Sequence, residues 1–190
     1  MPQLPRVIRT VVLVPLATAA LALTGAAPAH ADHSQPPPVS GEVLAWQPLS
    51  SSPVIGLKCM QVDKGHFDNF VLVDQFTCEY GNNQRWRMGQ ATGDPNVFWL
   101  QNVATAKCLD DYAYGLGQGN PIIQYDCLVG TNQQWRMIWD EQNGNAQFQN
   151  VNSGLCLSVD GIINTNYRRF VQNPCYGFVN ERFQPVQPTR

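Results

Sequence analysis

The chain has 190 residues, with 12 Lys and Arg against 14 Asp and Glu and a formal net charge of -2. This balance is unlike that of nucleic-acid-binding proteins, which normally present a basic face. The hydrophobic fraction of 44% is too high for a disordered chain, and the 15 glycines follow no three-residue period, which excludes collagen. The length favours one domain.

The first residues have the pattern of a secretory signal peptide. A basic start precedes an apolar, alanine-rich segment at 11–25, and a small-x-small cleavage pattern follows at Ala29-His30-Ala31. The apolar run is shorter than the roughly 20 residues that span a bilayer, so a membrane anchor is the weaker interpretation. We expect residues 1–31 to be a signal peptide of the bacterial type that is cleaved on export. The mature protein would then be secreted and extracellular, without a membrane span.

A short proline-rich linker is predicted next, at residues 32–41. The six cysteines that follow show that the rest of the chain is one unit repeated three times. Within each unit two cysteines lie 19 positions apart, and the pattern recurs after 49 and then 48 residues. Equal spacing predicts one disulfide inside each unit, worth about 3 kcal/mol on the chain-entropy model. The predicted pairs are Cys59–Cys78, Cys108–Cys127 and Cys156–Cys175.

A zinc site is the other interpretation of clustered cysteines. No Cys-x-x-Cys occurs, and beyond the predicted signal peptide the histidines are His33 and His66. We therefore expect no metal site and no other cofactor.

The repeated units have the pattern of short β-strands. Residues 97–103 and 146–151 alternate apolar and polar side chains, and residues 71–78 and 121–127 are apolar and rich in aromatics. No helix-length pattern follows residue 40. The sequence predicts a closed all-β structure, and three units are fewer than a β-propeller normally needs, which favours a threefold barrel capped by hairpins.

Each unit ends in a Gln-x-Trp-like element. The copies are Asn83-Gln84-Arg85-Trp86, Asn132-Gln133-Gln134-Trp135 and Asn180-Glu181-Arg182-Phe183. Together with Cys108-Leu109-Asp110, these elements resemble the ricin B-type β-trefoil lectins, which include the family 13 carbohydrate-binding modules of bacterial glycosidases. The resemblance implies a lectin domain over residues 42–190, with repeats that span about 42–91, 92–140 and 141–190.

The resemblance also assigns sugar-binding positions. A carboxylate accepts from sugar hydroxyls, an aromatic ring covers the C–H face of a pyranose, and amides donate and accept. The second repeat has the full set, which is Asp110, Tyr125, Asn132 and Gln133. The alternative is that Asp110 caps a turn and Tyr125 is an ordinary half-buried strand residue.

The residues that precede Tyr125 match the family pattern less closely than these four do. Ile123 stands where the family often has glutamine, and strand alternation should turn Gln124 to the other face. Asp111, Tyr112 and Tyr114 are expected at the rim.

The other repeats depart from the pattern. The first keeps Phe76, Asn83 and Gln84, but Gln61 occupies the carboxylate position, with Asp63 and Asp74 nearby. The third keeps only Asn180, because Ser158 and Asn173 replace the carboxylate and the ring, and we expect no binding there. The closing aromatics Trp86, Trp135 and Phe183 are expected in the core, and the closing glutamines can instead simply satisfy backbone groups.

The expected function is that of a secreted lectin module for galactose-type or xylan-type glycans, acting chiefly through the second repeat. The alternative is a protein-binding trefoil, such as an inhibitor or toxin-associated subunit, with vestigial sugar sites. An enzyme is not expected, because acids are few, no Gly-x-Ser-x-Gly occurs, and neither His has an evident nucleophile partner. The partners expected are oligo- or polysaccharides and not nucleic acid, while the particular sugar and the oligomeric state stay open.

Overall fold

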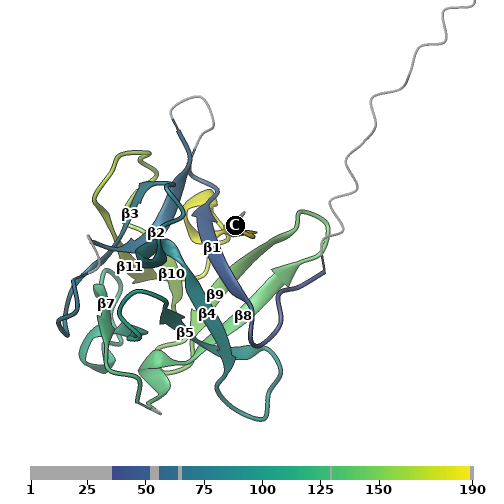
Figure 1. Cartoon of the computed structure of the whole chain (residues 1–190). Coiled ribbons are helices and arrows are strands. Elements are labelled where there is room, and N and C mark those ends of the chain that lie inside the picture. Colours follow the sequence, from purple (N-terminus) through teal and green to yellow (C-terminus); the bar gives the residue numbers. More distant parts are fainter. Residues whose placement is uncertain (1–35, 52–55, 64–65, 129, 189–190) are drawn as a thin grey trace, which may run out of the picture. The chain divides into compact units, whose positions relative to one another are not determined.

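The computed structural model describes residues 36–51, 56–63, 66–128 and 130–188 (Figure 1). The predicted signal peptide and the first part of the predicted linker lie outside these residues. The strands are β1 (Val43–Pro48), β2 (Lys58–Val62), β3 (Val73–Thr77), β4 (Trp86–Gln90), β5 (Val97–Asn102), β6 (Cys108–Asp111), β7 (Ile122–Tyr125), β8 (Trp135–Asp140), β9 (Asn145–Asn150), β10 (Cys156–Val159), β11 (Arg168–Asn173) and β12 (Phe183–Val186). Single-turn 3-10 helices are η2 (Asn82–Gln84), η3 (Tyr112–Tyr114), η4 (Thr131–Gln133) and η5 (Val179–Glu181).

Six strands close into an antiparallel barrel. The pairings run from β1 through β4, β5, β8, β9 and β12 back to β1, so the ring has no open edge. The hairpins β2–β3, β6–β7 and β10–β11 complete the three repeats. This is a β-trefoil, and the predicted fold class is confirmed. No helix in the described ranges is long and apolar enough to span a bilayer.

Side-chain alternation explains why these segments form strands. In β9, Ala146, Phe148 and Asn150 are buried, while Gln147 and Gln149, which alternate with them, are partly exposed. A period of two places one set of side chains in the barrel and the other on its outer face.

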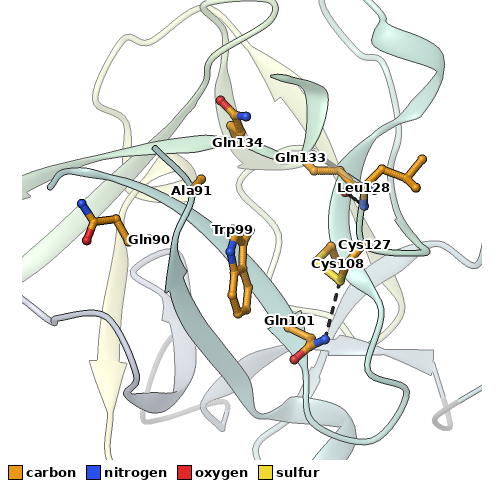
Figure 2. Close-up of a pocket in the computed structure, with 9 residues that line it drawn as sticks. All are labelled: Gln90, Ala91, Trp99, Gln101, Cys108, Cys127, Leu128, Gln133 and Gln134. Carbon is orange, nitrogen blue, oxygen red and sulfur yellow. Dashed lines mark hydrogen bonds between the residues drawn. A yellow bond between two sulfur atoms is a disulfide. The ribbon is translucent and has the colours of Figure 1, made fainter. Parts of the chain in front are cut away.

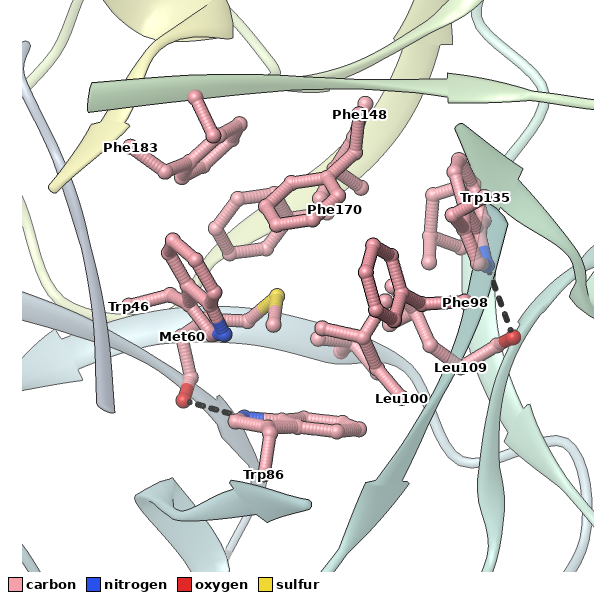
Figure 3. Packing of buried hydrophobic residues seen from close by; sticks show 14 of the residues in the cluster. Trp46, Met60, Trp86, Phe98, Leu100, Leu109, Trp135, Phe148, Phe170 and Phe183 are labelled. Carbon is pink, nitrogen blue, oxygen red and sulfur yellow. Dashed lines mark hydrogen bonds between the residues drawn. The ribbon is translucent and has the colours of Figure 1, made fainter. Parts of the chain in front are cut away.

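Large aromatic side chains fill the core (Figure 3). Trp86, Trp135 and Phe183 are fully buried, as predicted for the closing aromatics. The indole of Trp86 donates to the carbonyl oxygen of Met60 at 3.0 Å, and that of Trp135 to Leu109 at 3.1 Å. Phe183 has no N–H to make the third such bond, yet it packs as deeply as the two tryptophans. Burial of each such ring contributes about 2–3 kcal/mol.

The three predicted disulfides are confirmed. They join Cys59 to Cys78, Cys108 to Cys127 and Cys156 to Cys175, with Cα–Cα distances of 5.0, 5.0 and 5.1 Å. Each bond lies within one repeat, so contacts between repeats depend on strand pairing, packing and hydrogen bonds.

The start of the first repeat carries extra residues. The backbone N–H groups of Leu49, Val103 and Val151 make equivalent bonds to the carbonyls of the closing elements. Leu49 precedes Cys59 by ten positions, whereas Val103 and Val151 precede the first cysteines of their repeats by five. This insertion explains why the opening strand of the first repeat cannot be aligned from sequence alone.

The described end of the predicted linker is attached to the barrel. Gly41 donates its backbone N–H to Met88 at 2.7 Å, and Gln90 donates to the hydroxyl of Ser40 at 3.1 Å. Residues 40 and 41 therefore continue along β4.

Candidate functional site

A hollow of about 290 Å³ opens over the β6–β7 hairpin of the second repeat. The structure brings three of the four residues predicted for this repeat to its wall, namely Asp110, Tyr125 and Asn132. The fourth, Gln133, lies behind Asp110. The lining residues are Phe70, Asp110, Tyr112, Ala113, Tyr114, Ile123, Tyr125, Leu128 and Asn132.

Strand register explains this gathering. Asp110 pairs with Ile123 and Cys108 pairs with Tyr125, so the carboxylate and the phenol lie on the same face of the hairpin. Gln124 turns to the opposite face, as the alternation predicts. Asp111 also turns away, which corrects its expected place at the rim: it is fully buried, and its Oδ1 accepts from Asn120 at 2.6 Å.

Asp110 is a nearly buried carboxylate, with 4% of its surface exposed. Burial raises the pKa of this carboxyl group to about 6, although the hydrogen bond from Gln133 acts to lower the pKa. Gln133 Nε2 donates to Asp110 Oδ2 at 2.7 Å. The carboxylate is thus held in one orientation and is mostly ionised at pH 7.

The closing glutamines support the site from behind. Gln133 is 1% exposed, and besides Asp110 it contacts the backbone, donating to the carbonyl of Asp126 at 2.8 Å and accepting from the N–H of Leu128 at 2.7 Å. Gln84 of the first repeat donates to Thr77 and accepts from two turn N–H groups in the same way. The structure therefore favours the bracing interpretation for both side chains over direct contact with a ligand.

A ring from the first repeat completes the second-repeat hollow. Phe70 lies 5.0 Å from Tyr125 and 6.1 Å from Tyr112 between ring centroids. Its backbone φ is +68°, in the left-handed region that costs a residue with a Cβ roughly 1–2 kcal/mol. Such strain persists where surrounding contacts hold it. Here Phe70 donates its N–H to the carbonyl of Gln124 at 3.0 Å, and the neighbouring Asn69 binds Asp126.

Sequence reasoning missed Phe70, although a signal exists. The same position in the other repeats holds Gly119 and Tyr167, at offsets of 49 and 48 residues. All three have positive φ, and a glycine at this position marks the left-handed conformation. Tyr167 lies 5.1 Å from Phe76, so it supplies a second ring to the first repeat as Phe70 does to the second.

Each of the three hairpins carries one buried glutamine that holds a loop of a neighbouring repeat by hydrogen bonds to the loop backbone. Gln124 Nε2 donates to the carbonyls of His66 and Asp68 at 2.6 and 2.8 Å. Gln75 does the same for Ile163 and Thr165 of the third repeat. Gln172 does so for Gly115 and Gly117 of the second. We call Gln75, Gln124 and Gln172 the clasp glutamines. Because of them, each site has walls from two repeats.

The first repeat carries its carboxylate on the other strand. Asp74 pairs with Gln61 across the β2–β3 hairpin, in the register position of Ile123. Gln61 Nε2 donates to Asp74 Oδ1 at 2.9 Å, and Asn83 donates to Gln61 Oε1 at 3.2 Å. Burial raises the pKa of Asp74 to about 7. The predicted residues Phe76, Asn83 and Gln84 therefore stand beside a differently placed acid.

The third repeat presents neither a ring nor a carboxylate at the equivalent positions. Ser158 is fully buried and accepts from Asn180 Nδ2 at 2.9 Å, and Asn173 stands where the second repeat has Tyr125. Within the described ranges, no three His, Cys, Asp or Glu side chains gather as a metal site.

The fold has well-matched structural neighbours. The designed threefold-symmetric protein ThreeFoil superposes with a TM-score of 0.70 at 25% identity, over 77% of this chain and 99% of that one. The ricin B-like lectin of Macrolepiota procera, solved in complex with lactose, gives 0.66 at 12% identity, over 80% and 100%.

Part of a larger enzyme is also similar. An exo-β-1,3-galactanase from Clostridium thermocellum gives a TM-score of 0.67 at 21% identity, over 80% of this chain but only 30% of that one. A search of curated protein sequences found no match. The family model described as ricin-type β-trefoil lectin domain-like matches residues 54–125 and 131–190. With its barrel, its three local disulfides and its closing elements, the chain belongs to this family.

Proposed function

We propose that this chain is a carbohydrate-binding lectin domain and that the second-repeat hollow is its main site. The observation that carries the proposal is the meeting of Asp110, Tyr125 and Asn132 around one hollow, with Phe70 at its edge. A pyranose has an apolar C–H face, which a ring covers, and hydroxyls, which a carboxylate and an amide bind.

Galactose-type glycans are the first ligands to test, with xylan second. Two lectins of the same fold were solved with galactose-containing sugars: that of Macrolepiota procera with lactose, and that of Polyporus squamosus with an epitope described as Neu5Aca2-6Galb1-4GlcNAc. These neighbours support a saccharide as ligand.

The proposed activity is binding without catalysis. Glycoside hydrolysis normally uses two carboxyl groups roughly 5–9 Å apart across the scissile bond. Among the described residues that line the hollow, Asp110 is the one carboxylate. Its neighbour in sequence, Asp111, faces the other side of the strand.

Single sites of this size bind weakly. A dissociation constant of about 1 mM corresponds to about -4 kcal/mol. We propose the first repeat, with Phe76, Asn83 and Asp74, as a secondary site and the third as inactive. Retention on a glycan then depends on ligands with many equivalent units.

Export is part of the proposal. Three disulfides in a chain of this size fit an oxidising compartment. We propose that residues 1–31 are a signal peptide, that 32–41 link it to the domain, and that the lectin is secreted.

A glycan array tests the function directly. The disulfide-bonded protein should bind galactose- or xylose-containing glycans, and Tyr125→Ala should abolish the signal because the ring is lost. Asn173→Ala, at the equivalent position of the third repeat, is the matched control and should bind like the wild type. A blank array for the folded wild type would overturn the proposal in favour of a protein-binding trefoil.

A further inference from the structure

A second hollow, of about 420 Å³, lies on the outer face of the barrel beside the second repeat (Figure 2). Its volume falls in the range of small-molecule sites, roughly 300–1,000 Å³. The partly exposed indole of Trp99 stands in the middle of the lining residues in Figure 2. The lining residues are Gln90, Ala91, Trp99, Gln101, Cys108, Cys127, Leu128, Gln133 and Gln134.

The position of the indole depends on a glycine. Gly89 of β4 pairs directly with Trp99 of β5. A Cβ added to Gly89 would lie 1.8 Å from Trp99 Cζ2, so the ring rests directly on the glycine backbone. The equivalent pair on β8 and β9 is Ile138 and Gln147, which forms no such platform. The flat indole is therefore a particular feature of this one strand pair.

Amides surround the indole, and Figure 2 shows Gln90, Gln101 and Gln134 on different sides of it. Within the described residues, Gln101 Nε2 donates to the carbonyl of Ala106 at 2.9 Å and also contacts Cys127 Sγ, while its Oε1 accepts no hydrogen bond. None of the lining residues is charged. An aromatic face with an uncharged amide fringe suits a neutral ligand with an apolar face and hydroxyls, which is the chemistry of a sugar ring.

The two hollows adjoin. Leu128, which is 61% exposed, lines both of them. Gln101 pairs with Cys108, and Cys108 pairs with Tyr125, so Gln101 and Tyr125 stand on one face, two strand spacings or about 10 Å apart. One extended ligand that follows this face can reach both rings.

We propose that the Trp99 hollow is a second saccharide subsite next to the hollow of Asp110 and Tyr125, so that the second repeat binds an oligosaccharide across both. This inference rests on the proposed function, because the first sugar unit occupies the proposed main site. It makes the ligand a chain of sugars instead of a single terminal residue.

Nuclear magnetic resonance with xylose, xylohexaose, galactose and β-1,3-galactohexaose tests the proposal. The reporters are the indole N–H of Trp99 and the side-chain amide of Asn132. We expect a monosaccharide that binds to shift the Asn132 signal only, and the corresponding hexasaccharide to shift both. The Trp99 signal is assigned as the one lost in Trp99→Gln.

Calorimetric titration of variants gives the second measurement. Trp99→Gln introduces the residue that β9 carries at the equivalent position, and Gly89→Ala displaces the indole without removing it. Both should weaken hexasaccharide binding about tenfold and leave monosaccharide binding unchanged. Gln147→Ala, on the equivalent strand pair, is the matched control and should have no effect.

The outcomes separate the two proposals. A hexasaccharide that shifts Asn132 but not Trp99 overturns the subsite and leaves the proposed function intact. Shifts at Trp99 without Asn132 support saccharide binding in the Trp99 hollow and overturn the Asp110 site. If no probe shifts either signal, the proposed function and the subsite both fail.

Discussion

The second and third repeats share a scaffold and differ in what they place on it. Asn132 and Asn180 each donate a hydrogen bond to the equivalent β-strand carbonyl. Gln133 and Glu181 each accept hydrogen bonds from backbone N–H groups of equivalent turns. The side chains that differ are those around the hollow. They are Asp110 against Ser158, Tyr125 against Asn173, and Phe70 against Gly119. Most of the residues that hold the trefoil together are therefore separable from those proposed to bind sugar, and Asn132 belongs to both groups.

The third repeat lacks the carboxylate of Asp110, and it differs from the second repeat at two positions that depend on each other, Ser158 and Glu181. Gln133 donates to the carboxylate of Asp110, but Glu181 has no N–H to donate to an acid at position 158. A carboxylate there would face that of Glu181 in a buried place, which costs several kcal/mol when the charges are unpaired. Ser158 avoids this conflict. The third repeat would need at least both residues changed to regain an ionised acid.

The clasp glutamines provide the strongest test of shared walls. Gln124→Ala removes both bonds to the loop that carries Phe70 and should lower the free energy of unfolding by about 3 kcal/mol. Because the Phe70 wall then loosens, sugar binding should fall as well. Denaturant unfolding and calorimetric titration measure the two effects.

Gln75→Ala is the matched control for this experiment. It releases a loop of the third repeat that borders the first repeat, so stability should fall by about 2–3 kcal/mol while binding in the second repeat stays unchanged. If both variants lost the same amount of sugar binding, the second-repeat hollow would not depend specifically on its own clasp glutamine, Gln124.

The carboxylate gives the next largest effect. Asp110→Asn keeps the shape but removes the charge, so saccharide affinity should fall about 100-fold, since hydrogen bonds to charged groups contribute about 1.5–3 kcal/mol. The melting temperature at pH 7 should hold or rise, because burial disfavours the ionised form. Ser158→Ala in the third repeat should leave affinity unchanged, and an unaltered affinity in Asp110→Asn would remove the acid from the site.

Titration of the same acid should produce opposite trends in affinity and stability. The pKa of Asp110 is about 6, so its ionised fraction, and with it the affinity, should fall about tenfold from pH 7 to pH 5. The folded pKa lies above the usual value, so the native state binds protons more tightly, and stability should instead rise as pH falls through this window. Asp74, with a pKa of about 7, adds a stability effect of the same sign.

Calorimetry and thermal melts across pH 5–8 measure both trends. Asp110→Asn should flatten the affinity profile. If affinity in the wild type is constant over this range, the ionised acid does not contact the ligand.

The smallest effect is expected at the left-handed position. Phe70→Gly removes one ring wall and should weaken binding about fivefold. It also relieves backbone strain of roughly 1–2 kcal/mol, so the melting temperature should not fall despite the lost ring contacts. Tyr167→Gly is the matched change beside the first repeat and should leave the second-repeat site unaffected.

Much of this structure is predictable because it repeats at fixed spacing. The cysteine pairs, the trefoil and the burial of Trp86 and Trp135 follow from offsets of 49 and 48 residues. The meeting of Asp110 and Tyr125 follows from alternation within one hairpin. Their role in sugar binding stays a prediction.

The features that the sequence analysis missed depend either on contacts between repeats or on residues that occur on one strand pair only. Phe70 reaches the second-repeat hollow through pairing between hairpins, which no pattern within one repeat reveals. Trp99 and Gly89 occur on one strand pair only, so the repeat gives no signal for them. The orientation of Asp111 could have been predicted, since alternation places it opposite Asp110.

The closed ring also means that any of the three repeats could come first along the polypeptide. β12 pairs with β1 as β4 pairs with β5, with Val186 beside Ala45. A circular permutant that joins the end of β12, after Val186, to the start of β1, before Val43, by a short turn and opens the chain at residues 92–96 would preserve every strand pairing. Each hollow would keep its two contributing repeats, because their neighbours around the ring do not change.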